Sequence, residues 1–312
     1  MKQFFYFSLL TFVSISIGVL FIFSAYAKLF PIEPFEFTFV ELGIANWRTA
    51  PFFARFLISL ELFMGLLMLF CLYLNKFTLK LTISTLIFFN IYLVMLLFRK
   101  GDYGNCGCFG DYFAMTPSQA LIKNSILLVF LFILLYKFIG IQYGKFSIGI
   151  ATFFLLSSLA FPHIFNYVDF SYSKAYLNDV KINQTLPLDS LYSNFSYKKP
   201  IPNLNKGKKI VAFLSLTCPH CKIAARKIRI IKERNPELPF FFVLNGETEK
   251  LQLFFKETQT ESIPYTMLLG RPFIFLAGTN LPKIYLLNNS SVEFVVNYLD
   301  LDQAEIEKWL RQ

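Results

Sequence analysis

Long apolar stretches fill the first half of the chain, and a mixed polar and apolar pattern follows in the second half. A membrane-spanning helix needs about 20 mostly apolar residues. Five segments reach or approach this length, at residues 4–29, 51–74, 81–98, 121–139 and 146–165. Short connectors separate them. The pattern therefore predicts a membrane domain built from five helices.

The second half of the chain shows the alternation of an α/β domain, with more densely spaced charges. Residues 209–216 form a β-branched and aromatic run that is typical of a buried strand, and a helical pattern follows at 222–233. The next strand is predicted at 239–245. Two further strands, at 284–287 and 292–297, are separated by a turn and predict a hairpin.

The composition supports a membrane protein. Hydrophobic residues make up 55% of the chain, which has 40 Phe, and charged residues only 16%. Ordinary soluble domains contain roughly 25% charged residues. The many aromatic residues and the low charge exclude an intrinsically disordered chain, and the large apolar area argues against a single soluble globule. The net charge of +10 is scattered, without a nucleic-acid recognition motif. We therefore expect the lipid bilayer, and no nucleic acid, as a partner.

The motif Cys218-Pro219-His220-Cys221 carries the most specific chemical signal. It lies between the strand at 209–216 and the helix at 222–233, so Cys218 falls at a helix N-terminus. Backbone N–H groups and the helix dipole favour a thiolate there, and a protonated His220 would favour it further. Half of a zinc site is the alternative, but the strand–CxxC–helix context favours a redox-active pair.

These residues resemble a thioredoxin-fold domain, and the CPHC motif is similar to that of DsbA-type oxidoreductases. The resemblance implies a cis proline that faces the cysteine pair. Pro282 matches that position, with Leu281 contacting the partner protein, and Pro264 is a competing candidate. We expect this domain at 203–312, after a linker at 169–202.

A second pair, Cys106 and Cys108, lies among glycines in the connector after the third helix. Two cysteines one residue apart can close only a small, strained disulfide, which is easily reduced. Free thiols or metal ligands are the alternatives. The fifth cysteine, Cys71, stands alone and is expected to be a packing residue.

The membrane half resembles the DoxX/MauE family. The similarity rests on FSAYAKL at 23–29, ELFMG at 61–65, GNCGCFG at 104–110 and TPSQALIKN at 116–124. It implies a four-helix core within residues 1–145 and an association with redox work, including disulfide formation in exported enzymes. The fifth helix, at 146–168, would then tether the second domain.

An ionisable side chain, Glu61, falls well inside the second predicted helix. Such a group usually faces a partner inside the bundle, and Lys28 or Arg55 could be that partner. The residues would form either a structural ion pair or an intramembrane polar site.

The two cysteine pairs are predicted to face the same compartment, because two membrane spans separate Cys108 from Cys218. Disulfides persist in oxidising compartments. We therefore expect a protein of the bacterial inner membrane with a cytoplasmic N-terminus and a periplasmic C-terminal domain. Residues 25–27 have the form of a signal-peptide cleavage site, but the apolar run before them is longer than such peptides use.

Together these features predict a membrane-anchored thiol–disulfide oxidoreductase. It would exchange electrons between the CPHC pair, the CGC pair and exported client proteins that carry thiols or disulfides. The direction of exchange stays open. A quinone is a candidate electron carrier, although no residue pattern identifies a pocket for it. The alternatives are a membrane protein that handles copper or zinc, and a non-enzymatic assembly factor for an exported protein.

Overall fold

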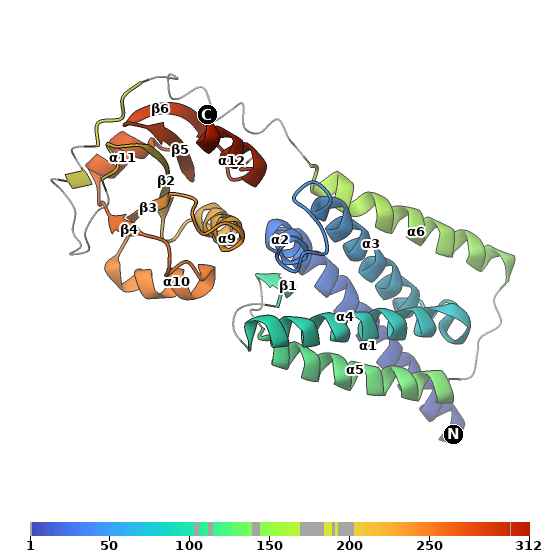
Figure 1. Cartoon of the computed structure of the whole chain (residues 1–312). Coiled ribbons are helices and arrows are strands. Elements are labelled where there is room, and N and C mark those ends of the chain that lie inside the picture. Colours follow the sequence, from blue (N-terminus) through green and yellow to red (C-terminus); the bar gives the residue numbers. More distant parts are fainter. Residues whose placement is uncertain are drawn as a thin grey trace. The chain divides into compact units, whose positions relative to one another are not determined.

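The computed structural model describes residues 2–102, 106–111, 115–138, 144–168, 184–188, 191–192, 203–299 and 301–312. The chain divides into two compact units, Met1–Val168 and Asp169–Gln312 (Figure 1). The first unit is helical and the second is built around a β-sheet.

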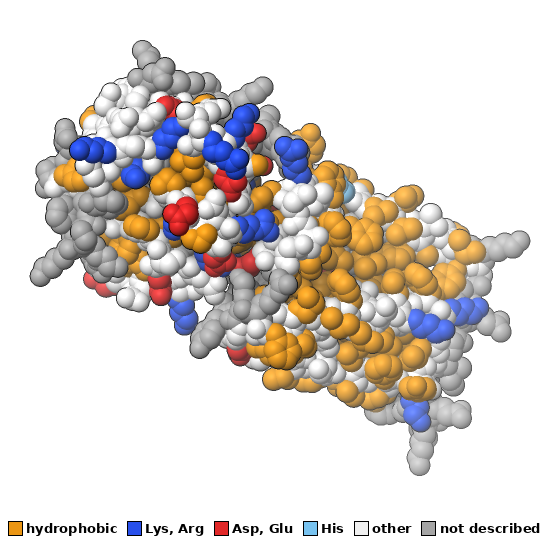
Figure 2. Space-filling model, viewed as in Figure 1, with side chains coloured by type: hydrophobic (Ala, Val, Ile, Leu, Met, Phe, Trp, Pro, Cys, Tyr) orange, Lys and Arg blue, Asp and Glu red, His pale blue; other side chains and the backbone are white. Residues whose placement is uncertain are grey.

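Five long helices form the first unit, and each is long and apolar enough to cross a membrane. They are α1 (Lys2–Leu29), α3 (Ala50–Leu69), α4 (Leu79–Lys100), α5 (Pro117–Lys137) and α6 (Lys145–Phe165). Hydrophobic side chains cover this unit in the view of Figure 2. The predicted helical membrane domain is confirmed. The expected helix at 51–74 is shorter than predicted, because Leu74–Thr78 forms a separate π-helical turn after a left-handed Tyr73.

Glycine permits the close approach of α1 and α3. A Cβ atom added at Gly18 would lie 2.8 Å from the carbonyl oxygen of Gly65, and one added at Gly65 would lie 2.9 Å from the carbonyl oxygen of Gly18. Larger residues would push the two backbones apart. This crossing brings Lys28 in the last turn of α1 next to Glu61 in α3.

The second unit contains a five-stranded sheet of order β4-β3-β2-β5-β6. Its strands are β2 (Lys208–Ser215), β3 (Phe240–Asn245), β4 (Tyr265–Met267), β5 (Lys283–Asn288) and β6 (Ser291–Val296). The first three run parallel, and β5 and β6 form an antiparallel hairpin beside β2. This arrangement confirms the predicted thioredoxin-like α/β fold.

Among the described residues, the helices named α9 (Pro219–Arg234), α10 (Leu251–Thr258), α11 (Arg271–Ala277) and α12 (Gln303–Arg311) accompany this sheet. The helix α9 directly follows the central strand β2 and so connects it to the parallel strand β3. On one face of the sheet, Phe213 and Tyr285 pack against Phe273 of α11 in a fully buried core.

Part of the range predicted as a linker belongs to this core. Leu186, Leu188 and Leu191 are buried in the same cluster as Phe213. Thr185 also forms an isolated β-bridge with Ser291. The predicted linker residues 169–183, 189–190 and 193–202 lie outside the described residues.

Candidate functional site

The CPHC pair lies at the start of α9, as the sequence predicts. Cys218 is the N-cap residue, and the backbone N–H of Cys221 donates a hydrogen bond to its Sγ at 3.4 Å. Pro219 occupies the first helical turn, where its missing N–H costs nothing. Cys218 is partly exposed and Cys221 is fully buried. A reacting sulfur can therefore approach Cys218 first.

The two sulfurs of this pair differ in acidity. Hydrogen bonds from the Cys221 side chain and backbone N–H, together with the charge of His220, lower the pKa of Cys218 to about 6. Burial and its hydrogen bond to Cys218 raise the pKa of Cys221. Since the thiolate is the nucleophile, Cys218 is suited to attack and Cys221 to resolve a mixed disulfide.

His220 has a partner that the sequence did not suggest. Its Nδ1 lies 3.2 Å from the hydroxyl oxygen of Tyr298, a buried residue after β6. No motif marks Tyr298, because it comes 78 positions later in the chain. Only the folded hairpin brings it to the CPHC turn.

Pro282 lies at the end of the sheet where β2 leads into the CPHC motif. The Leu281–Pro282 peptide bond is cis, and Lys283 directly after it pairs with Phe213 near the end of β2. Leu281 packs, half-buried, against the adjacent core. Pro264 instead immediately precedes β4.

The second pair lies in a tight turn that leads into the short strand β1 (Cys108–Asp111). The backbone N–H of Cys106 donates to the carbonyl of Met115 at 2.8 Å, and that of Gly110 donates to the carbonyl of Gly107 at 3.2 Å. Both glycines have positive φ angles, +73° and +56°. A Cβ atom at Gly110 would lie 2.0 Å from the carbonyl oxygen of Ala27, so only glycine lets this turn rest on α1.

The sulfurs of this turn are also unequal. The pKa of Cys108 is lowered to about 7 by a hydrogen bond from the Cys106 side chain and by the charges of Lys123 and Lys28, against opposing effects of burial and of Glu61. The hydrogen bond to Cys108 and burial raise the pKa of Cys106. Cys108 is therefore the sulfur suited to attack.

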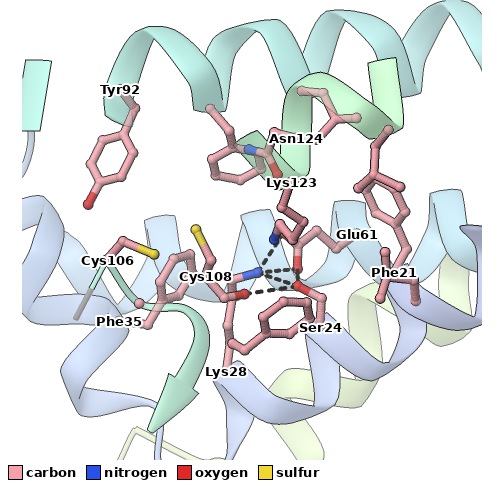
Figure 3. A pocket seen from close by; sticks show the side chains of 16 residues that line it. Phe21, Ser24, Lys28, Phe35, Glu61, Tyr92, Cys106, Cys108, Lys123 and Asn124 are labelled. Atoms are coloured by element: carbon pink, nitrogen blue, oxygen red, sulfur yellow. Dashed lines mark hydrogen bonds and ion pairs between the residues drawn. The ribbon is translucent and has the colours of Figure 1, made fainter. Parts of the chain in front are cut away.

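A buried polar cluster of Ser24, Lys28 and Glu61 forms a hydrogen bond with the backbone of Cys108 (Figure 3). The ammonium of Lys28 lies 2.7 Å from a carboxylate oxygen of Glu61 and donates to the hydroxyl of Ser24 at 2.7 Å. That hydroxyl in turn donates to the carbonyl oxygen of Cys108 at 3.0 Å. Both charged side chains are about 95% buried. Of the two candidate partners of Glu61, the structure selects Lys28.

Arg55 belongs to a different cluster. Its guanidinium pairs with Glu36 of α2 (Glu33–Glu41) at 2.7 Å and donates to the carbonyl of Asn166. The Asn166 side chain donates to the carbonyl of Leu29. Arg55 thus joins the ends of α1, α3 and α6, and the structure does not bring it to Glu61.

A cavity borders the cysteines of the turn and the polar cluster. Its empty volume, including an open mouth, is about 520 Å³. Phe21, Phe35, Phe89 and Phe109 are among its apolar walls, and the side chains labelled in Figure 3 converge on it. Sequence reasoning assigned no role to two polar residues here, Lys123 and Asn124: the family motif at 116–124 contains both, but they fall within a predicted membrane span.

These two residues of α5 both line the cavity. The Lys123 ammonium lies 4.2 Å from the centroid of the Phe109 ring, a cation–π contact. Asn124 is 97% buried. A capping box at Thr116 and Gln119 fixes the start of this helix.

The remaining cysteine, Cys71, is buried in the apolar core of the bundle, in line with the packing role expected for it. Over the residues that the structure describes, no three His, Cys, Asp or Glu side chains gather as a metal site would require. If a metal ion did bind, each cysteine pair would supply two thiolate ligands.

The comparisons with known proteins follow the same division. The family model of methylamine utilisation protein MauE matches residues 6–137, which covers most of the helical unit. Protein TlpB of Flavobacterium psychrophilum is 33% identical over 313 residues, covering 86% of this chain and 84% of that protein. This chain belongs to the TlpB family. The predicted MauE-like membrane domain joined to a thioredoxin-fold domain is confirmed.

Two solved structures similar to this chain cover 42% and 37% of it. The thioredoxin domain of a thiol-disulfide oxidoreductase from Bacteroides vulgatus is 14% identical with a TM-score of 0.31, and covers 42% of this chain and 99% of that domain. StoA from Bacillus subtilis is 16% identical with a TM-score of 0.28, and covers 37% and 92%. The fold assignment rests on strand order and helix position in the chain itself.

Proposed function

We propose that this TlpB-family protein passes electrons between its two cysteine pairs and exported client proteins by thiol–disulfide exchange. The chain is a membrane-bound thiol–disulfide oxidoreductase. The observation that supports exchange between its two pairs is that each pair combines a cysteine of lowered pKa, Cys218 or Cys108, with a buried cysteine of raised pKa. One chain thus contains two dithiols, each able to attack and to resolve.

In the oxidising direction, a client thiolate attacks Cys218 of the Cys218–Cys221 disulfide, and Cys221 leaves as a thiolate and takes up a proton. A second client thiolate then attacks the client sulfur of the mixed disulfide and releases the Cys218 thiolate. The client loses two electrons and the pair gains them. Stabilisation of the released thiolate favours this direction, because it favours the reduced pair.

The reduced pair then passes its electrons on. The Cys218 thiolate attacks the Cys106–Cys108 disulfide, and Cys221 resolves the resulting mixed disulfide. The Cys218–Cys221 disulfide forms again while Cys106 and Cys108 become a dithiol. Every step exchanges one S–S bond for another, so the electrons balance. Reversal of the sequence would reduce clients.

The membrane arrangement supports this exchange. Two membrane-spanning helices, α5 and α6, separate Cys108 from Cys218 in the chain, and an even number of crossings returns the chain to the same side. We place both pairs outside the cytoplasm, in the periplasm of a bacterial inner-membrane protein, because disulfides persist there. The clients would then be exported proteins.

We assign supporting roles to the remaining candidates. Lys28, Glu61 and Ser24 hold the backbone of Cys108 from inside the bundle, and Lys123 and Lys28 supply positive charge that favours its thiolate. In the second unit, Leu281 and Pro282 would contact the client chain, since they lie at the end of the sheet that carries the CPHC motif.

We propose the cavity beside Cys108 as the site for a quinone, the carrier considered from the sequence. Aromatic rings line it, and Lys123 and the buried Asn124 add polar groups to its wall. The ammonium of Lys123 and the Asn124 amide could donate hydrogen bonds to ring oxygens. A bound quinone would supply a two-electron, two-proton acceptor at this place. We therefore propose these residues as the ones that would hold it.

Substitution of the resolving cysteine tests the exchange between the pairs. In Cys221→Ser, the Cys218 thiolate should form a mixed disulfide that persists, either with a client or with Cys106 or Cys108 of the same chain. Non-reducing electrophoresis of membranes, followed by peptide mapping, would identify both products. Cys218→Ser is the matched control and should yield neither. Persistent absence of any link between Cys218 and the CGC pair would contradict the proposal.

A further inference from the structure

The connector after β6 is fastened to the helix that carries the CPHC motif. Lys227 of α9 is 96% buried, and its ammonium donates to the carbonyl of Leu299 at 2.7 Å. The backbone N–H of Leu299 donates to the side-chain oxygen of Asn297 at 3.3 Å. These bonds fix the backbone on both sides of Tyr298.

Tyr298 itself is 96% buried, and its hydroxyl reaches the first turn of α9. The hydroxyl oxygen lies 3.2 Å from Nδ1 of His220, and the ring centroids are 6.2 Å apart. His220 is exposed. An exposed imidazole would sample several rotamers, so a hydrogen bond to a fixed partner restricts where it can lie.

The position of the imidazole matters for the adjacent sulfur. Its charge contributes to the lowered pKa of Cys218, after the hydrogen bonds from Cys221. A phenolic hydroxyl can accept a hydrogen bond from a protonated imidazole and can donate one to a neutral imidazole. The contact with Tyr298 therefore holds the ring in both charge states.

We propose that Tyr298 is a positioning residue for the Cys218–Cys221 pair: its hydroxyl fixes the His220 ring beside Cys218 and so makes the disulfide a stronger oxidant. The inference rests on the proposed redox function of this pair. It adds Tyr298, a residue 78 positions later in the chain, to those that set the reduction potential of the pair. In this proposal Tyr298 acts through His220, the ring that its hydroxyl meets.

The variant Tyr298→Phe tests this role, because it keeps the buried ring and removes only the hydroxyl. The full-length protein in detergent would be equilibrated with mixtures of reduced and oxidised glutathione. Alkylation and mass spectrometry of the Cys218 peptide would then give the fraction reduced. We expect the exchange equilibrium to shift about threefold towards the disulfide, the size of a modest hydrogen bond. The midpoint of the Cys218 alkylation profile should move to higher pH.

Three controls separate the outcomes. His220→Ala should shift the equilibrium at least as far, and Tyr298→Phe should have no further effect in that background. Tyr192→Phe removes another hydroxyl of the same domain, which accepts from the backbone N–H of Leu204, and should leave the equilibrium unchanged. The inference would be overturned if Tyr298→Phe left the equilibrium unchanged. It would also be overturned if Tyr298→Phe shifted the equilibrium equally in the wild-type and the His220→Ala backgrounds. A wild-type pair that never forms a disulfide would instead overturn the proposed function.

Discussion

The two cysteine pairs reach the same chemical asymmetry by different structural means. In the α/β unit, a helix N-terminus stabilises Cys218, and the backbone N–H of Cys221 points at its sulfur. In the helical unit, Cys108 lies in a glycine-rich turn, and the charges of Lys123 and Lys28 on the surrounding helices add to the hydrogen bond from the Cys106 side chain. The first pair is therefore tuned mostly by its own helix N-terminus, whereas the second depends more on tertiary packing in the bundle.

This difference predicts that the CGC pair is the more sensitive to changes in backbone packing. In Gly110→Ala, the new Cβ would lie 2.0 Å from the carbonyl oxygen of Ala27, in a left-handed conformation, so the turn must leave α1. We expect Cys106 and Cys108 to stop cycling while Cys218 and Cys221 still react with glutathione. Redox-state labelling of each cysteine peptide in intact cells would measure this.

Gly107→Ala is the matched control for the turn. Its φ is also positive, at +73°, but its added Cβ would meet nothing closer than 3.8 Å. We expect only the cost of a left-handed alanine, roughly 1 kcal/mol, and continued cycling. If both variants cycled equally well, close packing on α1 would not be what positions the CGC pair.

A second prediction concerns the charged cluster beneath Cys108. Glu61→Gln leaves the Lys28 ammonium in a buried site without its carboxylate, and breaking a buried pair in this way costs roughly 3–5 kcal/mol. We expect a clear fall in the thermal unfolding midpoint of the detergent-solubilised protein. The same change should weaken cycling of Cys108, whose backbone carbonyl depends on Ser24 in that cluster.

The double variant Lys28→Met/Glu61→Met tests the reason for this effect. It removes both charges, so no unpaired ion remains in the bundle, and stability should recover relative to Glu61→Gln. If the double variant were as unstable as Glu61→Gln, the two side chains would stabilise the bundle by their packing and not by their charges.

The same contrast explains what the sequence could predict. Length and apolar content were enough for the five membrane helices, and the strand–CPHC–helix pattern was enough for the α/β unit, because both signals are local in the chain. Glu61 was recognised because a charge in an apolar run is conspicuous. Its partner could not be chosen, since Lys28 and Arg55 both fit until the helix crossing at Gly18 and Gly65 is known.

The residues that sequence reasoning missed share one property. Tyr298 lies in no motif, and the family motif at 116–124 contains Lys123 and Asn124 without assigning them a role; Lys123 and Tyr298 acquire their roles only by meeting other segments. Strand β4 was missed for another reason: three residues are too short for a periodic pattern to show. The part of the expected linker that packs into the core contributes Leu186, Leu188 and Leu191, which are too few and too scattered in a mostly polar range to show a periodic pattern.

The smallest predicted effect separates the two means of stabilising a thiolate. Lys123→Met removes a charge that lowers the pKa of Cys108, and Lys123→Arg keeps it. Because the thiolate is the reactive form, a higher pKa leaves less thiolate at neutral pH. We expect the alkylation rate of Cys108 at pH 7 to fall roughly threefold to tenfold in Lys123→Met, with its profile displaced to higher pH, and to stay near the wild-type value in Lys123→Arg.

Cys218, whose pKa is about 6, should keep its profile in both variants. Lys137→Met alters the opposite end of the same helix and serves as the control. A Cys108 profile that does not change in Lys123→Met would show that the charge of Lys123 does not tune this thiolate, and the contrast drawn between the two pairs would lose its support from α5.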